Sequence, residues 1–426
     1  MYQICKTINF GMQTKMRFNK DKPVSKQDGV WLKNKLQDMG PTYIKIGQFM
    51  SSRRDIFDRN IVEALKDLQD NVKPIDDQDI KNVIGSSLDI NYFNKIDRKP
   101  IASASIGQVH KGYLNNDSLC AIKIKRPNVQ EEIEKDLEII YQIMKIFKLL
   151  KMEGIDETVE LMDEFKDFIV KEADYNNELS NISLYSKIYS NDTDIILPRV
   201  YKNISTSDAI IMSFVPSIKL TEINDKLSPE KKSEIAYRLM DFFVLQMIEN
   251  GVIHGDPHEG NIGYSLENDK FVVYDLGNII TVNLKFRSLI KRFIFEIMVE
   301  NIDSAVDILN KIEYVDVRDE ESLKVYLVKY IEYIKTIDIK VFTKDLDEAD
   351  ARTFKKIPIK LDGIIFRLIR VFGLVEGICK DLDPGFNYNA VFLKYVNLLT
   401  NDPEFLDYKI KNDIKFVLQS FLKNLI

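Results

Sequence analysis

The chain has 426 residues, of which 45% are hydrophobic and 30% charged, a balance that excludes disordered, collagen-like and fibrous chains. At about 150 residues per domain, this length predicts two or three structural units. Lys and Arg number 60 and Asp and Glu 66, so the net charge of −6 includes no basic excess that would favour nucleic-acid binding.

The predicted elements begin with helices. Residues 29–72 have helical hydrophobic spacing that is interrupted at Gly40-Pro41, where a second helix is expected to start. From about residue 99, two short strands, residues 108–114 and 119–125, flank a polar turn. Helical spacing returns at residues 131–151 and 157–188, further strands are expected at 195–200 and 209–215, and residues from 227 onward are mostly helical. This order predicts an α+β fold with a helical segment in front.

Cysteine content and hydropathy bear on location. Cys5, Cys120 and Cys379 are widely separated and odd in number, which disfavours a disulfide framework or a cysteine-based zinc site and favours a reducing, intracellular setting. No uncharged stretch approaches the roughly 18–20 residues that cross a bilayer. Residues 1–20 are basic without an acid and weakly resemble a transit peptide. We expect a cytoplasmic or peripheral membrane protein, with mitochondrial import as the alternative.

The most informative segment is His254-Gly255-Asp256-Pro257-His258-Glu259-Gly260-Asn261. An Asp followed five residues later by an Asn has the spacing of a kinase catalytic loop, in which the Asp faces the acceptor and the Asn binds metal. Asp275 follows the apolar run 271–274 and precedes Leu276-Gly277, so we expect it at a strand end, directed to the same metal. A solvated turn is the alternative, because Asp, Asn, Gly and Pro favour turns by themselves.

The two histidines of this loop raise the question of zinc. His254 and His258 have i,i+4 spacing, but the Glu of a His-Glu-x-x-His helix is missing between them. Pro257 also disfavours a helix interior at this point. We therefore expect a histidine that orients the loop.

A kinase site also needs a cation at the phosphates, and residues 119–125 provide one. Strand alternation places Ala121 and Lys123 on one face, with Lys123 at the phosphates and Ala121 over the adenine, as in Val-Ala-Ile-Lys. Upstream, alanines and serines replace the expected Gly-x-Gly-x-x-Gly loop: Ala102, Ser103, Ala104 and Ser105. Alanine restricts the backbone more than glycine does, so nucleotide handling should differ from that of a standard protein kinase.

The expected hinge next to the adenine is the segment from Met212 to Ser217. It lacks the Glu and Gly often found in a kinase hinge. Met212, Phe214 and Val215 would therefore leave the polar adenine contacts to backbone groups.

In their order along the chain, these segments resemble the UbiB/ADCK family of atypical kinases. The matches run from about residue 40 to 280 and include Lys45-Ile46-Gly47-Gln48, residues 100–110, Arg126-Pro127, Glu172-Ala173-Asp174-Tyr175 with Glu178, and the His-Gly-Asp-Pro-His loop. Residues 380–384 extend the similarity only loosely. The resemblance implies an atypical protein-kinase-like bilobal fold: a helical extension over residues 1–95, an N-lobe over 96–216 and a mainly helical C-lobe over 217–426.

The resemblance also implies roles for charged residues outside the kinase core. In the family, the Lys-x-Gly-Gln helix covers the nucleotide pocket, so Lys45 and Gln48, at i,i+3, would point into the cleft. Glu172 and Asp174 match acids that engage this helix and the metal–nucleotide region. Glu178 is the candidate ion-pair partner of Lys123. A solvated, charged helix face is the alternative for these acids.

The implied activity is binding of ATP with Mg²⁺, followed by hydrolysis or slow phosphoryl transfer, in isoprenoid lipid or quinone metabolism at a membrane. Lys123 would bind the phosphates, Asp256 would act as base or orient the acceptor, and Asn261 and Asp275 would hold the metal. His-Gly-Asp replaces His-Arg-Asp and no Ala-Pro-Glu follows, which disfavours control by a phosphorylated activation loop. A small-molecule phosphotransferase of the aminoglycoside or choline type and a nucleotide-binding scaffold with weak catalysis remain the alternatives.

Overall fold

A computed structural model describes residues 2–18, 23–51, 53, 57–68, 84–85, 88–150, 155–223, 226–258, 260–336, 358–387, 391 and 394–395. The chain divides into two compact units, Met1–Ser217 with Gly263–Asn278, and Ile218–Ile262 with Ile279–Ile426. The first boundary lies close to the predicted one at residue 216. The return of Gly263–Asn278, and with it Asp275, to the first unit differs from the prediction that residues 217–426 form one lobe.

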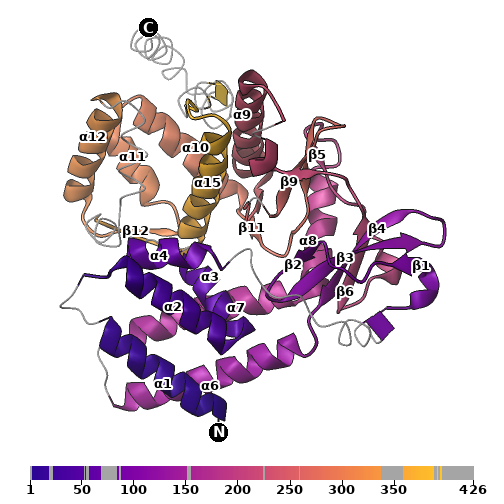
Figure 1. Cartoon of the computed structure of the whole chain (residues 1–426). Helices are drawn as coiled ribbons and strands as arrows, with labels where there is room; N and C mark the ends of the chain where they lie inside the picture. The colour runs from indigo at the N-terminus through magenta and orange to yellow at the C-terminus, as the bar shows by residue number, and fades with distance from the viewer. Residues whose placement is uncertain are drawn as a thin grey trace. The chain divides into compact units, whose positions relative to one another are not determined.

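The first unit opens with helices α1 (Tyr2–Arg17), α2 (Lys26–Met39), α3 (Pro41–Ser51) and α4 (Arg59–Lys66) (Figure 1). The break predicted at Gly40-Pro41 is present. Gly40 has a φ of 116°, a conformation that glycine adopts most readily, and a proline suits the first position of the next helix. Buried Leu32, Leu36 and Leu65 join these helices in one apolar cluster.

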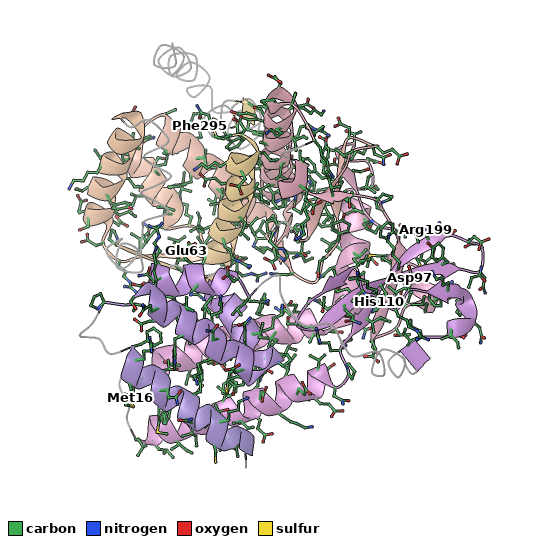
Figure 2. The ribbon with its side chains drawn as sticks, viewed as in Figure 1. Met16, Glu63, Asp97, His110, Arg199 and Phe295 are labelled. Atoms are coloured by element: carbon green, nitrogen blue, oxygen red, sulfur yellow. The ribbon has the colours of Figure 1, made fainter. Side chains whose placement is uncertain are left out.

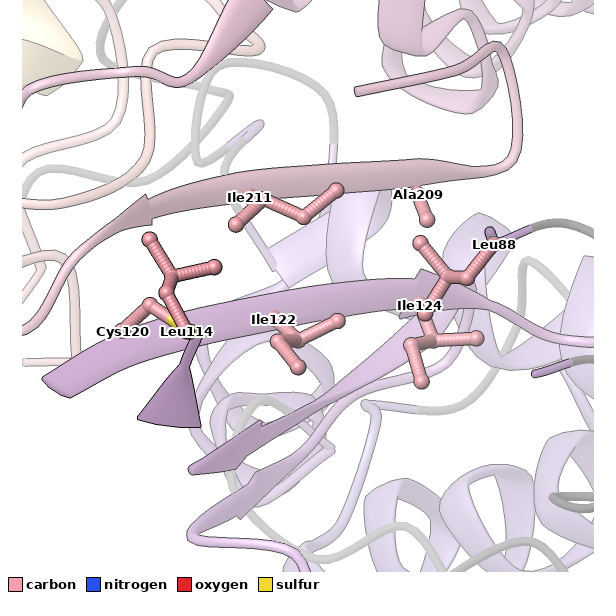
Figure 3. Close-up of a cluster of buried hydrophobic side chains, with 7 residues drawn as sticks. All are labelled: Leu88, Leu114, Cys120, Ile122, Ile124, Ala209 and Ile211. Atoms are coloured by element: carbon pink, nitrogen blue, oxygen red, sulfur yellow. The ribbon is translucent and has the colours of Figure 1, made fainter. Parts of the chain in front are cut away.

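A small sheet follows, built from strands β1 (Phe93–Ile96), β2 (Ala102–Ser103), β3 (Gly107–Leu114), β4 (Leu119–Lys125) and β6 (Ala209–Ser213). Its order is β1-β3-β4-β6, with β2 beside β3, and these pairs are antiparallel. Figure 3 shows Cys120, Ile122 and Ile124 of β4 in the same cluster as Ala209 and Ile211 of β6. The alternation predicted for residues 119–125 is therefore confirmed.

The sheet also encloses a polar pair. His110 of β3, labelled with Asp97 in Figure 2, donates from Nδ1 to the Asp97 carbonyl at 2.8 Å. Its Nε2 lies 2.7 Å from Nε2 of Gln108 and therefore accepts the amide hydrogen. Burial lowers the pKa of His110, so the ring is neutral and both of its nitrogens have partners.

Helices α6 (Val129–Leu149), α7 (Ile155–Ala173) and α8 (Tyr175–Ile188) complete the first unit with strands β5 (Ile195–Ile196), β9 (Ile262–Ser265) and β10 (Lys270–Val273). The helical spacing predicted over residues 157–188 is present, and Asp174 divides it into α7 and α8. The Asp174 carboxylate accepts the backbone N–H of Asn176 at 2.9 Å and so caps α8. Phe271 of β10 pairs in parallel with Ile195 of β5, which anchors residues 263–278 in this unit.

Short elements link these parts: 3₁₀ turns η1 (Ile90–Tyr92) and η2 (Lys202–Ile204) in the first unit, and strand β7 (Ile218–Lys219) with 3₁₀ turn η3 (Leu220–Ile223) in the second. The predicted strand over residues 195–200 is shorter, although Val200 still bridges to Met212. Strand β6 ends before Pro216, which has no N–H to continue a ladder.

The second unit contains α9 (Pro229–Leu245), the π-helical turn η4 (Gln246–Asn250), β8 (Val252–His254), β11 (Ile279–Thr281), α10 (Leu284–Met298), α11 (Ile302–Leu309), β12 (Val315–Val317), α12 (Glu320–Thr336), β13 (Ile359–Leu361) and α15 (Gly363–Leu382). Strands β8 and β11 pair antiparallel, and α15 runs along α9 (Figure 1). No helix in the described ranges combines the length and apolar character that crossing a bilayer requires.

Candidate active-site residues

Lys123 lies at the centre of a charged cluster in the first unit. Its ammonium donates to both carboxylate oxygens of Glu178, at 2.7 Å each, and to Oδ2 of Asp275 at 2.8 Å. Strand β4 supplies the lysine, helix α8 supplies Glu178, and the segment after β10 supplies Asp275. The ion pair predicted between Lys123 and Glu178 is confirmed. The contact with Asp275 is an addition, because that residue was expected to face a metal.

Burial makes this cluster strongly coupled. Burial, assisted by the charge of Asp275, raises the pKa of Glu178, whose side chain is 1% exposed, to about 7. Burial alone would lower the pKa of Lys123, but Asp275 and Glu178 hold that pKa well above its usual value. With both carboxyls ionised, the cluster has one more negative than positive charge, which a bound metal ion would offset.

Helix α8 also holds the turn that contains Asp275. Asn181 donates from its side chain to the Leu276 carbonyl at 2.9 Å. The Gly277 N–H donates to Oδ1 of Asp275 at 2.8 Å. The Asp275 carboxylate is therefore held on one oxygen by its own turn and on the other by Lys123.

Tyr175 is a buried member of this site that sequence analysis missed. Its ring centroid lies 5.3 Å from the Lys123 ammonium and 5.0 Å from that of Lys125, so it supports both cations. A Cβ added to Gly107 would lie 2.4 Å from the Tyr175 hydroxyl, which explains the need for glycine at the start of β3. The only available signal was its place directly after Glu172-Ala173-Asp174.

The alanine-rich loop is a tight hairpin. Ala102 and Ser103 pair with β3, and the Ala104 N–H donates to the Gly107 carbonyl at 2.8 Å. Arg126, at the end of β4, donates to the Ala104 carbonyl at 2.9 Å and to the Ser103 hydroxyl at 3.1 Å. Ser105 is buried within the turn. The loop shape thus depends on one arginine as well as on the ladder.

The residues expected around the adenine lie partly together. Ala121 of β4 pairs with Met212 of β6, and both belong to one apolar cluster against which Val109 and Phe214 pack. Val215, directly after Phe214, is half-buried. The apolar cluster thus includes residues of β4, which also carries Lys123, of β6 and of the segment after it.

The Lys-x-Gly-Gln helix is α3, and its two polar residues have different partners. Lys45 is buried and forms an ion pair with Glu172 of α7. Gln48 donates instead to the Leu68 carbonyl at 2.7 Å, so the expectation that both point into one cleft is corrected. Asp174 is exposed and its carboxylate caps α8, and its expected role beside α3 and the nucleotide stays a prediction.

The catalytic-loop motif lies in the second unit, directly after β8. The Gln246 side chain accepts the His254 N–H at 2.8 Å, and Nδ1 of His254 accepts the Asp256 N–H at 3.3 Å. Asn261 donates from Nδ2 to the Asp256 carbonyl at 3.0 Å. His254 is fully buried and orients the loop, as expected. This bond uses the Asn261 amide nitrogen, and the amide oxygen is the group on that side chain that could bind a metal.

Asp256 has a partner that sequence analysis did not identify. Arg370 of α15 donates to Oδ1 of Asp256 at 2.6 Å, and Nε2 of His258 lies 3.8 Å from Oδ2. Arg370 and Asp256 are 114 positions apart in the sequence. Local sequence patterns do not predict a contact over such a separation.

The donor chemistry fits Mg²⁺. This ion binds oxygen ligands, commonly one or two side chains together with substrate phosphates. The Asp275 carboxylate in the first unit and the Asn261 amide oxygen in the second are each groups of this kind. In the part of the chain that the structure describes, no cluster of three or more His, Cys, Asp or Glu side chains suits a metal. A site completed by nucleotide phosphates requires no such cluster.

Comparison with known proteins agrees with these observations. The model of the family described as the ABC1 atypical kinase-like domain matches residues 67–309, more than half of the chain. A relative named Protein ACTIVITY OF BC1 COMPLEX KINASE 7, chloroplastic, from Arabidopsis thaliana is 26% identical over 389 residues, covering 89% of this chain and 56% of its own length. A Histophilus somni relative named Probable protein kinase UbiB is 31% identical over 271 residues, which cover 61% of this chain and 50% of that protein.

The fold has a counterpart among solved structures. Rv3197 from Mycobacterium tuberculosis, in complex with erythromycin, is 23% identical and aligns over 79% of this chain and 88% of its own with a TM-score of 0.56. The predicted atypical protein-kinase-like α+β fold is confirmed. The chain spans only about half the length of the two sequence relatives, at 56% and 50%.

Proposed function

The chain belongs to the ABC1 atypical kinase-like family, and we propose that it binds ATP with Mg²⁺ and hydrolyses it or slowly transfers its γ-phosphate. The observation that carries the proposal is the buried contact of Lys123 with Glu178 and Asp275. It combines the Lys–Glu ion pair and the metal-binding Asp that active kinases require.

Each polar group has a proposed task. Lys123 binds the phosphates, and Glu178 fixes the direction of its ammonium. Asp275 and Asn261 are the metal ligands, and bound Mg²⁺ would neutralise charge on the phosphates. Asp256 orients the acceptor hydroxyl or water and takes up its proton.

The proposed nucleotide surface comes from the hairpin and β4. Arg126 holds the alanine-rich hairpin, Ala102 to Ser105, so that its backbone lies close to the phosphates. Ala121, Met212, Phe214 and Val215 contact the adenine. Because Lys123 already donates to Asp275, phosphate binding replaces that contact while Glu178 keeps its own. This exchange contributes to slow turnover.

Lys45 is proposed to act beside the phosphates through its ion pair with Glu172, which restricts the acceptors that reach the site. The proposed setting is isoprenoid lipid or quinone metabolism at a membrane surface, on the strength of the family and the UbiB name of one relative. The assay described next tests the phosphoryl acceptor and the membrane location separately from the hydrolysis of ATP.

The test measures phosphate release from Mg-ATP with and without liposomes and phenolic quinone precursors. We expect the wild-type protein to release phosphate and Lys123→Ala to abolish this release. The control is Lys95→Ala, which changes an exposed lysine of the same sheet and should leave phosphate release intact. Lys123→Ala should also weaken ATP far more than adenosine, because only ATP carries the charge that the lysine meets. Equal losses for both ligands would indicate a packing role.

Two outcomes would replace the proposal. Nucleotide binding without phosphate release under every condition would favour a scaffold. Phosphorylation of aminoglycosides or choline, with no effect of liposomes or phenols, would favour a small-molecule phosphotransferase.

A further inference from the structure

Helix α15 delivers an arginine to the catalytic loop from outside the matched family segment. Arg370 donates from Nη2 to Oδ1 of Asp256 at 2.6 Å, and the side chains are 16% and 23% exposed, respectively. The family model ends at residue 309, so it covers Asp256 but not Arg370. A charge-assisted hydrogen bond of this length in a largely buried place is among the stronger polar contacts in proteins.

The helix that carries Arg370 is firmly packed within the second unit. Val371, Val375 and Cys379 of α15 are fully buried. The Cys379 thiol contacts the Ala236 carbonyl of α9 at 3.2 Å, and Ser233 donates to the Asp383 carboxylate at 2.6 Å. Arg370 therefore extends from a fixed backbone, and only its side chain has to be ordered.

A second arginine of α15 contacts the strands next to the loop that contains Asp256. Arg367, one turn before Arg370, donates to the Ile279 carbonyl of β11 at 3.1 Å. Ile279 pairs with His254, the last residue of β8 and the first of the His-Gly-Asp motif. The α15 face with Arg367 and Arg370 thus lies along the paired strands β8 and β11, and β8 leads directly to Asp256.

The loop itself lacks an arginine that could do this. Gly255 occupies the position of the arginine in His-Arg-Asp, and it has no side chain. The His254 and Asn261 side chains bond the main-chain N–H and carbonyl of Asp256, whereas the Arg370 guanidinium bonds its carboxylate, and Nε2 of His258 lies 3.8 Å from the other carboxylate oxygen. The Arg370 guanidinium therefore restricts the side-chain torsions of Asp256 and offsets a negative charge that would otherwise repel the nucleotide phosphates.

We propose that Arg370 is a positioning residue that holds the Asp256 carboxylate in its working orientation. The inference rests on the proposed phosphoryl chemistry, because the orientation of the Asp256 carboxylate matters for function only if that chemistry occurs. It predicts that Arg370 acts through Asp256 and contributes little to nucleotide affinity.

The experiment is a double-mutant cycle on the full chain with Arg370→Ala, Asp256→Asn and the pair, read in Mg-ATP turnover and in melting temperature. We expect Arg370→Ala to lower kcat by on the order of tenfold to a hundredfold with KM for Mg-ATP within about twofold. The double variant should be no slower than Asp256→Asn alone. Arg370→Lys and added guanidinium should each restore part of the kcat lost by Arg370→Ala, which a purely structural loss would not allow.

Lys380→Ala, on the same helix and paired with Glu376, is the matched control and should retain wild-type turnover. Additive losses in the cycle, a rise in KM alone, or faster turnover of Arg370→Ala would overturn the inference. If the wild-type protein shows no turnover at all, the proposed function fails. The melting cycle then decides the inference separately: additive shifts would overturn it, and non-additive shifts would retain the coupling of Arg370 to Asp256.

Discussion

Replacing Lys123 with alanine should destabilise the protein in a way that grows with pH. The substitution leaves Glu178, which is 1% exposed, without its cation. A buried charge that loses its partner costs about 3–5 kcal/mol when it stays charged. Glu178 can bind a proton instead, because burial and Asp275 already raise its pKa to about 7 with the lysine present. Loss of the ammonium raises that pKa further.

The direction follows from proton binding. The folded variant keeps the Glu178 proton at pH values where the unfolded chain, with the ordinary glutamate pKa of 4.5, has released it. Stability therefore falls as pH rises from the unfolded to the folded pKa. In the wild type this fall ends at about pH 7, whereas in the variant it continues, by up to about 1.4 kcal/mol per pH unit. Lys123 stays protonated throughout, because its folded pKa is well above the usual value.

Urea unfolding between about pH 6 and pH 9 measures this effect. Trp31, the single tryptophan, lies in α2 of the same unit as Lys123, so its fluorescence follows the relevant transition. We expect a modest loss at the acid end that increases above about pH 7. The double variant Lys123→Ala/Glu178→Gln should lose the pH dependence, and Lys95→Ala should match wild type. A loss that is constant with pH, or larger in acid, would refute the reasoning.

Three further outcomes are expected. Asp275→Asn removes a charged metal ligand, so the Mg²⁺-dependent part of the ATP-induced melting shift should disappear, and an unchanged shift would show that Asp275 does not bind metal. Lys45→Ala should alter ATP turnover or autophosphorylation while lowering the free energy of unfolding by no more than about 2 kcal/mol, because Glu172 keeps access to water. If the variant matched wild type in melting temperature, ATP affinity and turnover, Lys45 would be an ordinary structural lysine. Arg126→Ala removes two hydrogen bonds to the alanine-rich loop, and Ala102→Gly gives its backbone more freedom. Calorimetric titration should show that each substitution changes ATP affinity by about fivefold. Unchanged affinity in both variants would contradict a role for the loop.

Several features were available in the sequence because they depend on neighbours along the chain. Alternation in residues 119–125 separated Lys123 from the core-facing Ile122, since successive side chains of a strand point to opposite faces. Gly40-Pro41 marked a helix boundary through backbone conformations that only those residues favour. The spacing of Asp256 and Asn261 indicated a catalytic loop in which the amide bonds the preceding carbonyl.

Other features were decided by the tertiary structure. The sequence did not show that Asp174 caps a helix, and the structure shows its carboxylate accepting the Asn176 N–H at the start of α8. Gln48 shares a helix with Lys45, yet it bonds the end of α4 because α4 packs against α3. The sequence shows both side chains, but it does not show which groups pack against them.

The long-range ion pairs show the physical reason most directly. Lys45 and Glu172 are 127 positions apart, and Arg370 and Asp256 are 114 apart. Periodicity and capping act over a few residues, so the sequence alone determined several of the elements, the core-facing side of β4 and the motif spacing. Which charged side chains meet depends on how buried apolar faces bring helices and strands together. Only that packing decided that Arg370 of α15 would contact Asp256 of the His-Gly-Asp motif.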